Sequence, residues 1–310
     1  MIEVRNLRKT YSGGVEAVKG IDFEVPPGEV FGLLGPNGAG KSTTIGMLTT
    51  TIAPTSGTAK LAGFDVAKHP LAARRLSSVV FQEPVVDRSL TGRRNLDLHA
   101  RLWGVVDREA KPRIDELSAA LGLSELIDRP VGSYSGGERR RLEIARALVS
   151  SPRVLFLDEP TVGLDPRIRA ELLDVIAGLR ARSDMTVLLT THYLDEAERL
   201  CDRIAIIHAG RIVALDTPGA LLAELGRQIL EIRVNGSPRT ALEALRARGI
   251  ADVEAFTVGA TLTVPLRDAN AGDAIATVHE LGVATAISTR QPTLDDVYLR
   301  LTGGRLAAAA

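Results

Sequence analysis

The sequence predicts an α/β fold of the P-loop NTPase type with a helical subdomain, followed by a small α+β domain. Three observations support this prediction. Residues 35–43 fit the pattern G-x-x-x-x-G-K-[ST] at every required position. A second apolar strand pattern ends in the carboxylates of Asp158 and Glu159. Near Gly226 the order of strands and helices changes, which places one domain at 1–226 and a second at 227–310.

Short strand and helix patterns surround the glycine-rich loop, and a longer helical region follows. Apolar residues recur at helical spacing in that region, as Ile114, Leu117 and Leu121 do. The expected strands are Ile2–Arg5, Val15–Val25, Val30–Leu34, Thr58–Leu61 and Ser77–Phe81, and the expected helices are Lys41–Leu48, Leu71–Leu76, Arg93–Gly104 and Ala110–Leu121.

The loop lies between a buried strand and a helix, which is the context that phosphate binding needs. Glycines let backbone N–H groups surround anionic oxygens, and the helix N-terminus adds partial positive charge. Lys41 is expected to reach the β- and γ-phosphates of a nucleoside triphosphate, and Ser42 to ligate magnesium. A ligand-free glycine-rich turn would explain neither the Lys-Ser pair nor the flanking elements. The expected nucleotide-binding residues are Gly35, Pro36, Asn37, Gly38, Ala39, Gly40, Lys41, Ser42 and Thr43.

The strand Val154–Asp158 carries the acidic pair at its end. Asp158 is placed to hold magnesium, through water. Glu159 is placed to orient or deprotonate the water that attacks the γ-phosphate. An apolar strand ending in Asp-Glu is also compatible with a surface turn, and the phosphate-binding loop upstream favours the catalytic interpretation.

A second glycine pair, Gly136-Gly137, follows Ser135 at the start of a helical pattern. Ser135 is in the position of an N-cap, and the glycines would let a phosphate approach the helix closely. One chain needs one phosphate loop per nucleotide, so this surface is expected to complete the site of another molecule. An ordinary serine-capped helix would account for Ser135 but not for the glycine pair.

Through these motifs and their order, the first domain resembles the nucleotide-binding subunit of ATP-binding cassette (ABC) transporters. The resemblance implies ATP and Mg²⁺ as cofactors. It assigns Gln82 to magnesium and the attacking water, His192 to the γ-phosphate, and Asp165 to a loop that crosses between two subunits. Tyr11 falls where an aromatic ring stacks on adenine. Singly, each has an ordinary alternative: a surface glutamine, a structural histidine, or a tyrosine covering a sheet edge.

Some positions depart from the family pattern. The signature usually reads Leu-Ser-Gly-Gly-Gln, whereas this chain has Tyr134 and Glu138 at its ends. Tyr134 is familiar in the branch of drug-resistance exporters similar to daunorubicin-type ATPases, and residues 139–145 and 292–298 look like the same branch. Arg94 stands where many relatives have glutamate, in the segment where the family meets its permease.

Composition narrows the function classes. The basic and acidic residues number 38 each, so no broad attraction to nucleic acid is expected. A run of eighteen or more apolar residues is absent from the sequence, and the first residues read as a strand, so we expect neither a membrane span nor a signal peptide. The single cysteine, Cys201, is expected to be a buried thiol.

The resemblance implies a head-to-tail homodimer that closes around ATP and drives a separate polytopic permease. The chain would then be a peripheral subunit at the cytoplasmic face of the membrane, driving efflux of a drug-like or lipid-like molecule. The alternative is a soluble cassette ATPase acting on ribosomes or DNA. Such relatives usually carry paired cassettes or long coiled-coil insertions. A third possibility is a binding module whose catalytic site is degenerate. It is disfavoured because the residues that hydrolysis needs are all present: Lys41, Asp158, Glu159 and His192.

The C-terminal domain shows the order βαββα, completed by a further strand, which indicates a two-layer ferredoxin-like fold. Its sequence shows no cluster suited to chemistry, so its role stays open between dimer stabilisation and ligand sensing or permease contact. Its expected elements are Ile229–Val234, Thr240–Arg248, Val253–Val258, Ala260–Val264, Ala269–Leu281 and Thr285–Ser288.

Overall fold

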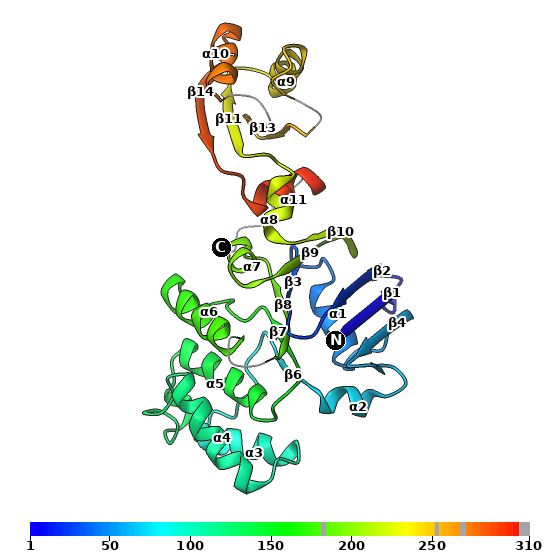
Figure 1. The fold of residues 1–310 in the computed structure, drawn as a ribbon, viewed down its shortest axis with the longest axis vertical. Coiled ribbons are helices and arrows are strands. Elements are labelled where there is room, and N and C mark those ends of the chain that lie inside the picture. The colour runs from blue at the N-terminus through cyan, green and yellow to red at the C-terminus, as the bar shows by residue number, and fades with distance from the viewer. Residues whose placement is uncertain (181–183, 252–253, 267–270, 304–310) are drawn as a thin grey trace. The chain divides into compact units, whose positions relative to one another are not determined.

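The computed structural model describes residues 1–180, 184–251, 254–266 and 271–303 (Figure 1). The chain divides into two compact units, Met1–Ile212 and Val213–Ala310. The sequence pattern changes later, near Gly226. Residues 213–226 therefore lie in the second unit, although the sequence predicts that they belong to the first domain. The exact domain boundary stays a prediction.

A six-stranded sheet has the order β10-β9-β3-β8-β7-β6; five of its strands lie wholly in the first unit, and β10 begins there and continues past Ile212. Strand β3 pairs in parallel with β8 and β9, and β7 pairs in parallel with β6 and β8. Carboxyl ends of parallel strands lie at one edge of a sheet, so the segments that follow β3, β6, β7 and β8 meet there. The strands are β3 Val30–Leu34, β6 Ser77–Val80, β7 Val154–Asp158, β8 Thr186–Thr191, β9 Arg203–His208 and β10 Arg211–Asp216.

A smaller antiparallel sheet has the order β2-β1-β4-β5, with β1 Ile2–Thr10, β2 Glu16–Val25, β4 Ser56–Leu61 and β5 Phe64–Asp65. The expected strands of this part are confirmed. Strand β5 was not predicted, because a strand of this length carries no periodic pattern. The helices α1 Lys41–Leu48 and α2 Pro70–Arg75 also match the sequence patterns.

The helical region of the first unit is built from α3 Gly92–Leu102, α4 Asp107–Ala120 and α5 Gly136–Leu148, which Figure 1 shows grouped together. A short 3₁₀ turn, η1 Val131–Ser133, leads into α5. The buried stripe of α5 includes Leu142, Ala145 and Leu148, the spacing that predicted it. Two further helices, α6 Pro166–Arg180 and α7 Leu194–Leu200, complete the unit.

The second unit contains a four-stranded antiparallel sheet in the order β12-β13-β11-β14. Its chain order, βαββαβ, confirms the ferredoxin-like prediction. The starts of the expected strand at Val253 and helix at Ala269 lie outside the described residues. The elements are α8 Pro218–Ala223, β11 Gln228–Val234, α9 Pro238–Ala247, β12 Phe256–Val258, β13 Thr261–Leu266, α10 Ala271–Leu281, β14 Ala284–Arg290 and α11 Leu294–Thr302.

Candidate ATP-binding and hydrolysis site

The phosphate-binding loop is held by close backbone contacts that only glycine permits. A Cβ at Gly35 would lie 2.3 Å from the carbonyl oxygen of Ile207 in β9, and one at Gly40 would lie 2.6 Å from that of Ala17 in β2. Gly40 also has φ +109°, in the left-handed region that favours glycine. The loop and the start of α1 therefore have a shape that no other residue at these positions would preserve.

Lys41 is buried within this loop and contacts the end of β7. Its Nζ donates to the carbonyl oxygens of Gly35 and Pro36 at 2.7 and 3.2 Å, and lies 3.0 Å from Oε1 of Glu159. Both side chains are almost fully buried, at 4% and 6% exposure. A buried charge is tolerated only when paired and hydrogen-bonded, so each group depends on the other.

Asp158 lies beside the loop serine. Ser42 Oγ donates to Asp158 Oδ1 over 3.2 Å, and Thr190 Oγ1 donates to the same oxygen over 2.6 Å. A hydroxyl and a carboxylate fit Mg²⁺, which takes oxygen ligands and fills its remaining positions with water and phosphate. Ser42 and Asp158 are therefore suited to hold the ion together.

Glu159 has an unusual backbone conformation for a residue that is not glycine, with φ +46°. Its N–H donates to Thr190 Oγ1 over 3.0 Å, and its Oε2 lies 3.3 Å from Nδ1 of His192. Residues held in sparsely populated backbone regions cluster at functional sites, where the surroundings determine them. The structure thus gathers Lys41, Ser42, Asp158, Glu159 and His192 at one sheet edge.

Three other predicted residues lie apart from this cluster in the structure. Gln82 is exposed just after β6, and no hydrogen bond or ion pair of its side chain occurs within the described residues. Tyr11 is 39% exposed, with its hydroxyl 3.3 Å from Thr43 Oγ1, beside the loop. Asp165 accepts from the backbone N–H groups of Arg167 and Ile168 and caps α6. The nucleotide roles of these residues stay predictions.

The signature segment begins α5 with a complete capping box. Ser135 Oγ accepts from the N–H of Glu138 over 3.3 Å, and Glu138 Oε2 accepts from the N–H of Ser135 over 2.6 Å. Glutamate in place of the usual glutamine therefore completes the capping box, and it also places a negative charge at the positive end of the helix dipole. A Cβ at Gly137 would lie 2.4 Å from Cγ2 of Ile168, so α6 packs too closely there for a side chain. At Gly136 the nearest atom, in Leu164, is 3.8 Å away.

The second departure within the signature, Tyr134, packs against the start of α3. Its ring is buried and its hydroxyl donates to the carbonyl oxygen of Leu126 over 2.5 Å. A Cβ at Gly92 would lie 2.6 Å from that hydroxyl oxygen. Tyrosine at this position therefore requires glycine at the start of α3.

We expect Gly92→Ala to lower the free energy of unfolding by about 1–3 kcal/mol, because the new methyl group overpacks against Tyr134. Urea unfolding followed by circular dichroism measures this change. The pair Gly92→Ala and Tyr134→Leu together should recover part of the loss, since leucine lacks the phenol. Stabilisation by Gly92→Ala alone, as at an unobstructed helix glycine, would contradict the assignment.

Sequence reasoning missed residues that shape this site without being in a known motif position. Thr190 contacts both Asp158 and Glu159, and Arg140 of α5 donates to the carbonyl oxygens of both. The available signals were the threonine pair before His192 and an arginine at core-facing spacing in α5. Neither signal distinguishes a site residue from a structural one.

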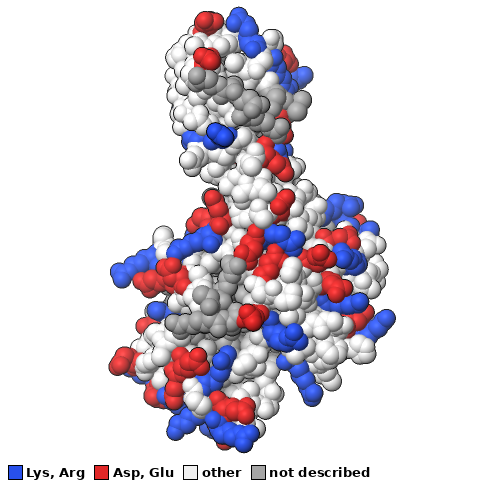
Figure 2. Space-filling view, viewed as in Figure 1, with Lys and Arg blue, Asp and Glu red and all other residues white. Residues whose placement is uncertain are grey.

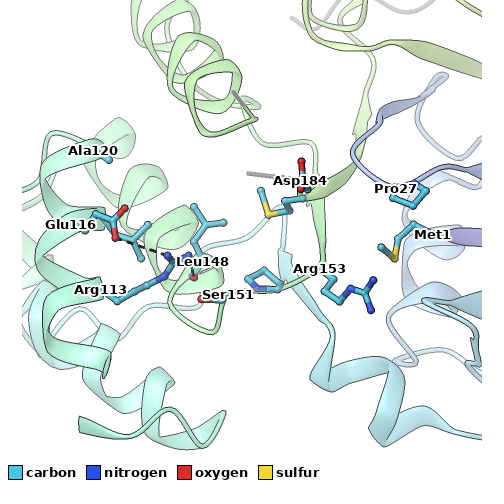
Figure 3. A pocket seen from close by; sticks show the side chains of 12 residues that line it. Met1, Pro27, Arg113, Glu116, Ala120, Leu148, Ser151, Arg153 and Asp184 are labelled. Carbon is cyan, nitrogen blue, oxygen red and sulfur yellow. Dashed lines mark hydrogen bonds and ion pairs between the residues drawn. The ribbon is translucent and has the colours of Figure 1, made fainter. Parts of the chain in front are cut away.

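A separate cavity of about 560 Å³ lies between the helical region and the sheets (Figure 3). Its lining includes Met1, Glu116 and Arg153, and Arg113 donates from Nη2 to the carbonyl oxygen of Leu148 over 3.3 Å. The residues expected to bind nucleotide do not line it. This cavity is therefore distinct from the candidate site.

The loop, the acidic strand end and the histidine at one edge of a mostly parallel sheet define an ATPase of the P-loop class. The chain belongs to the ABC transporter family, whose model matches residues 18–162. It is 44% identical to the daunorubicin/doxorubicin resistance ATP-binding protein of Streptomyces peucetius, over 97% of this chain and 92% of that protein.

Two further likenesses agree with this assignment. The linearmycin resistance ATP-binding protein of Bacillus subtilis is 36% identical, over 99% of both chains. A solved ATP-binding cassette, a dimer in a post-hydrolysis state bound to ADP and Pi, superposes with a TM-score of 0.63 at 25% identity. That match covers 70% of this chain and 98% of the cassette.

Proposed function

We propose that this chain is the ATP-hydrolysing subunit of an exporter, and that it drives efflux of a drug-like or lipid-like molecule through a separate membrane permease. The observation that carries the proposal is the cluster formed by Lys41, Ser42, Asp158, Glu159 and His192 at one sheet edge. The full-length similarity to resistance ATP-binding proteins supports the substrate class.

In the proposed mechanism, the loop N–H groups and Lys41 bind the β- and γ-phosphates and orient the γ-phosphate. Glu159 accepts a proton from the attacking water, and His192, beside it, contacts the γ-phosphate. Magnesium, held by Ser42 and Asp158, would neutralise charge on the phosphate oxygens. Gln82 positions the attacking water, and Tyr11 stacks on the adenine.

The site is completed by a second copy of the chain in a head-to-tail homodimer. Ser135, Gly136 and Gly137 of one copy face the nucleotide held by the other, and Asp165 lies on the loop that crosses between them. The dimeric cassette with ADP and Pi supports this arrangement. Loss of the γ-phosphate would remove contacts that hold the copies together, which reopens the dimer.

The permease is proposed to contact the helical region. Among the described residues, no helix is both long and apolar enough to cross a bilayer. Large apolar side chains are exposed on and after α3: Leu98 at 51%, Leu102 at 70% and Trp103 at 43%. Leu98 and Leu102 are four residues apart and share a helix face. An exposed apolar face of this kind fits a protein partner rather than water.

Nucleic acid is not the partner that the charges favour. Positive and negative side chains are interspersed over the face that Figure 2 shows. Net charge is zero, so counterion release from a phosphate backbone would contribute little affinity.

The chain is proposed to act at the cytoplasmic face of the membrane as a peripheral subunit.

The test is to purify the tagged chain from gently solubilised native membranes and identify what comes with it. We expect a stoichiometric polytopic membrane protein. Leu102→Asp should reduce its recovery at least about tenfold, while the ATP turnover of the purified chain stays within about twofold. Leu71→Asp is the matched control, because Leu71 is also 70% exposed but belongs to α2.

Ribosomal proteins or DNA-repair factors in place of a permease would contradict the export proposal and favour the soluble alternative. Equal loss of the membrane protein in both leucine variants would contradict the assignment of α3 as the contact surface.

A further inference from the structure

Arg140 of α5 connects the ends of two neighbouring strands. Its guanidinium donates to the carbonyl oxygen of Phe81, just after β6, over 2.5 Å. It also donates to the carbonyl oxygens of Asp158 and Glu159 at 3.2 Å each, and of Pro160 at 2.6 Å, all at the end of β7. The residue is 5% exposed. One side chain therefore satisfies four carbonyl groups beside the catalytic cluster.

Glu143 lies one helical turn further along α5. Arg140 binds the first residue of the segment 81–86, which contains Gln82, and Glu143 binds the last two residues of this Gln82 segment. Its Oε1 accepts from the N–H groups of Val85 and Val86 at 2.6 and 2.7 Å. Its Oε2 accepts from Nε of Arg146 over 3.1 Å, and the side chain is 1% exposed. A carboxylate buried to this extent needs such partners, so the contact strongly favours one position of the segment.

We propose that Arg140 and Glu143 are positioning residues, which fix both ends of the segment 81–86 to α5 and thereby set where Gln82 and Glu159 stand relative to each other. The inference rests on the proposed role of Gln82 in hydrolysis.

The geometry explains why the strand ends need this support. Glu159 has a backbone in the left-handed region, and its carbonyl oxygen and N–H are held by Arg140 and Thr190 respectively. Without Arg140, the carbonyl oxygen of Glu159 would lose its charged donor and retain the N–H of Val162, 3.3 Å away, so the left-handed backbone of Glu159 would have less support. Gln82 has no side-chain hydrogen bond within the described part of the chain, so its placement depends on its own backbone.

The contacts of Glu143 continue to the exposed face of α3. Arg146 Nη1 lies 3.3 Å from Nδ1 of His99, whose ring stacks on Trp103 at a centroid distance of 4.3 Å. Burial lowers the pKa of His99 to about 4, so its ring is neutral at pH 7 and accepts from the guanidinium. A shift of α3 on partner binding would therefore reach the Gln82 segment through side chains already in contact.

Steady-state ATP turnover of the full chain tests the proposal. We expect Glu143→Ala to lower kcat about tenfold or more while KM for ATP changes less than about threefold, because the segment moves but the phosphate loop does not. Glu143→Gln should stay within about threefold of the unaltered chain, since its amide oxygen still accepts both N–H groups. Arg140→Met should behave as Glu143→Ala does, and Arg140→Lys should recover part of the activity.

Arg141→Met is the matched control. Arg141 neighbours Arg140 on α5, and the described residues offer it no hydrogen bond or ion pair. Its kcat should be unchanged. Melting temperatures of all variants separate loss of position from loss of fold: Glu143→Gln and Glu143→Ala with similar melting temperatures but different kcat values support positioning.

A double-mutant cycle with Gln82→Ala identifies the route of action. If Glu143 acts through Gln82, adding Glu143→Ala to Gln82→Ala should lower kcat by less than twofold further. Additive losses, or an unchanged kcat in Glu143→Ala, would overturn the inference and leave the ATPase proposal intact. An unchanged kcat in Gln82→Ala would overturn both the role of Gln82 and the inference.

Discussion

The substitution Glu159→Gln is expected to lower the ATP turnover of the purified chain by roughly 10²–10⁴-fold, the usual contribution of a positioned general base. The amide keeps the shape of the side chain and an oxygen that accepts from Lys41, which lies 3.0 Å from Oε1 of Glu159. It has no basic oxygen for the proton of the attacking water. ATP binding should therefore persist while hydrolysis stops.

Release of phosphate and binding of a fluorescent ATP analogue, measured on the same preparation, separate these effects. Glu198→Gln, an exposed position on α7, controls for loss of a carboxylate in general. Its turnover should match that of the unaltered chain. Residual turnover above about one tenth in Glu159→Gln would remove Glu159 from the role of base.

Lys41→Met is expected to weaken ATP binding strongly and also to destabilise the fold. The methionine side chain is uncharged, so the loop loses the cation that contacts the phosphates. Glu159, at 6% exposure, would remain buried without the ammonium that neutralises it. Breaking a buried pair in this way costs about 3–5 kcal/mol, because the remaining carboxylate loses its ammonium partner and retains only the His192 ring, 3.3 Å from its Oε2.

The double variant Lys41→Met with Glu159→Gln distinguishes the two consequences. It should regain most of the lost unfolding free energy, because no buried charge is left unpaired, but it should not regain ATP affinity. Chemical denaturation and equilibrium nucleotide binding measure the two quantities. Recovery of binding along with stability would mean that Lys41 acts on the fold alone.

Much of this fold could be predicted because its elements carry strong local signals. The strand–loop–helix around Lys41 and the apolar strand before Asp158 each have a pattern that few other structures satisfy. The ferredoxin-like order of the second unit followed from alternating short elements. Helix α11 was not predicted, although Thr293 and Asp296 form the capping box that begins it.

The parts of the site that escaped prediction depend on contacts between distant segments. Thr190 meets Asp158 across adjacent strands, and Arg140 reaches four carbonyl groups from a helix. Such contacts are set by the packing of the sheet and leave no spacing pattern in one sequence. The sequence shows that Tyr134 departs from the family signature. Only the structure shows that its hydroxyl occupies the space that a side chain at Gly92 would need.

In the proposed dimer, Ser135, Gly136 and Gly137 complete the nucleotide site of a second copy. Gly136 allows a direct test, because a Cβ there meets only an ordinary contact 3.8 Å away within its own chain. A glutamate in the first turn also suits a helix N-terminus. Gly136→Glu should therefore leave folding and nucleotide binding by a single copy unchanged, while placing negative charge on the face proposed to meet ATP.

The measurement is the molar mass of Glu159→Gln by light scattering, with and without ATP and magnesium, alone and combined with Gly136→Glu. We expect an ATP-dependent dimer for Glu159→Gln and a monomer at all ATP concentrations for the combined variant. A dimer that persists with Gly136→Glu would contradict the claim, because the start of α5 would then lie outside the interface that closes on ATP.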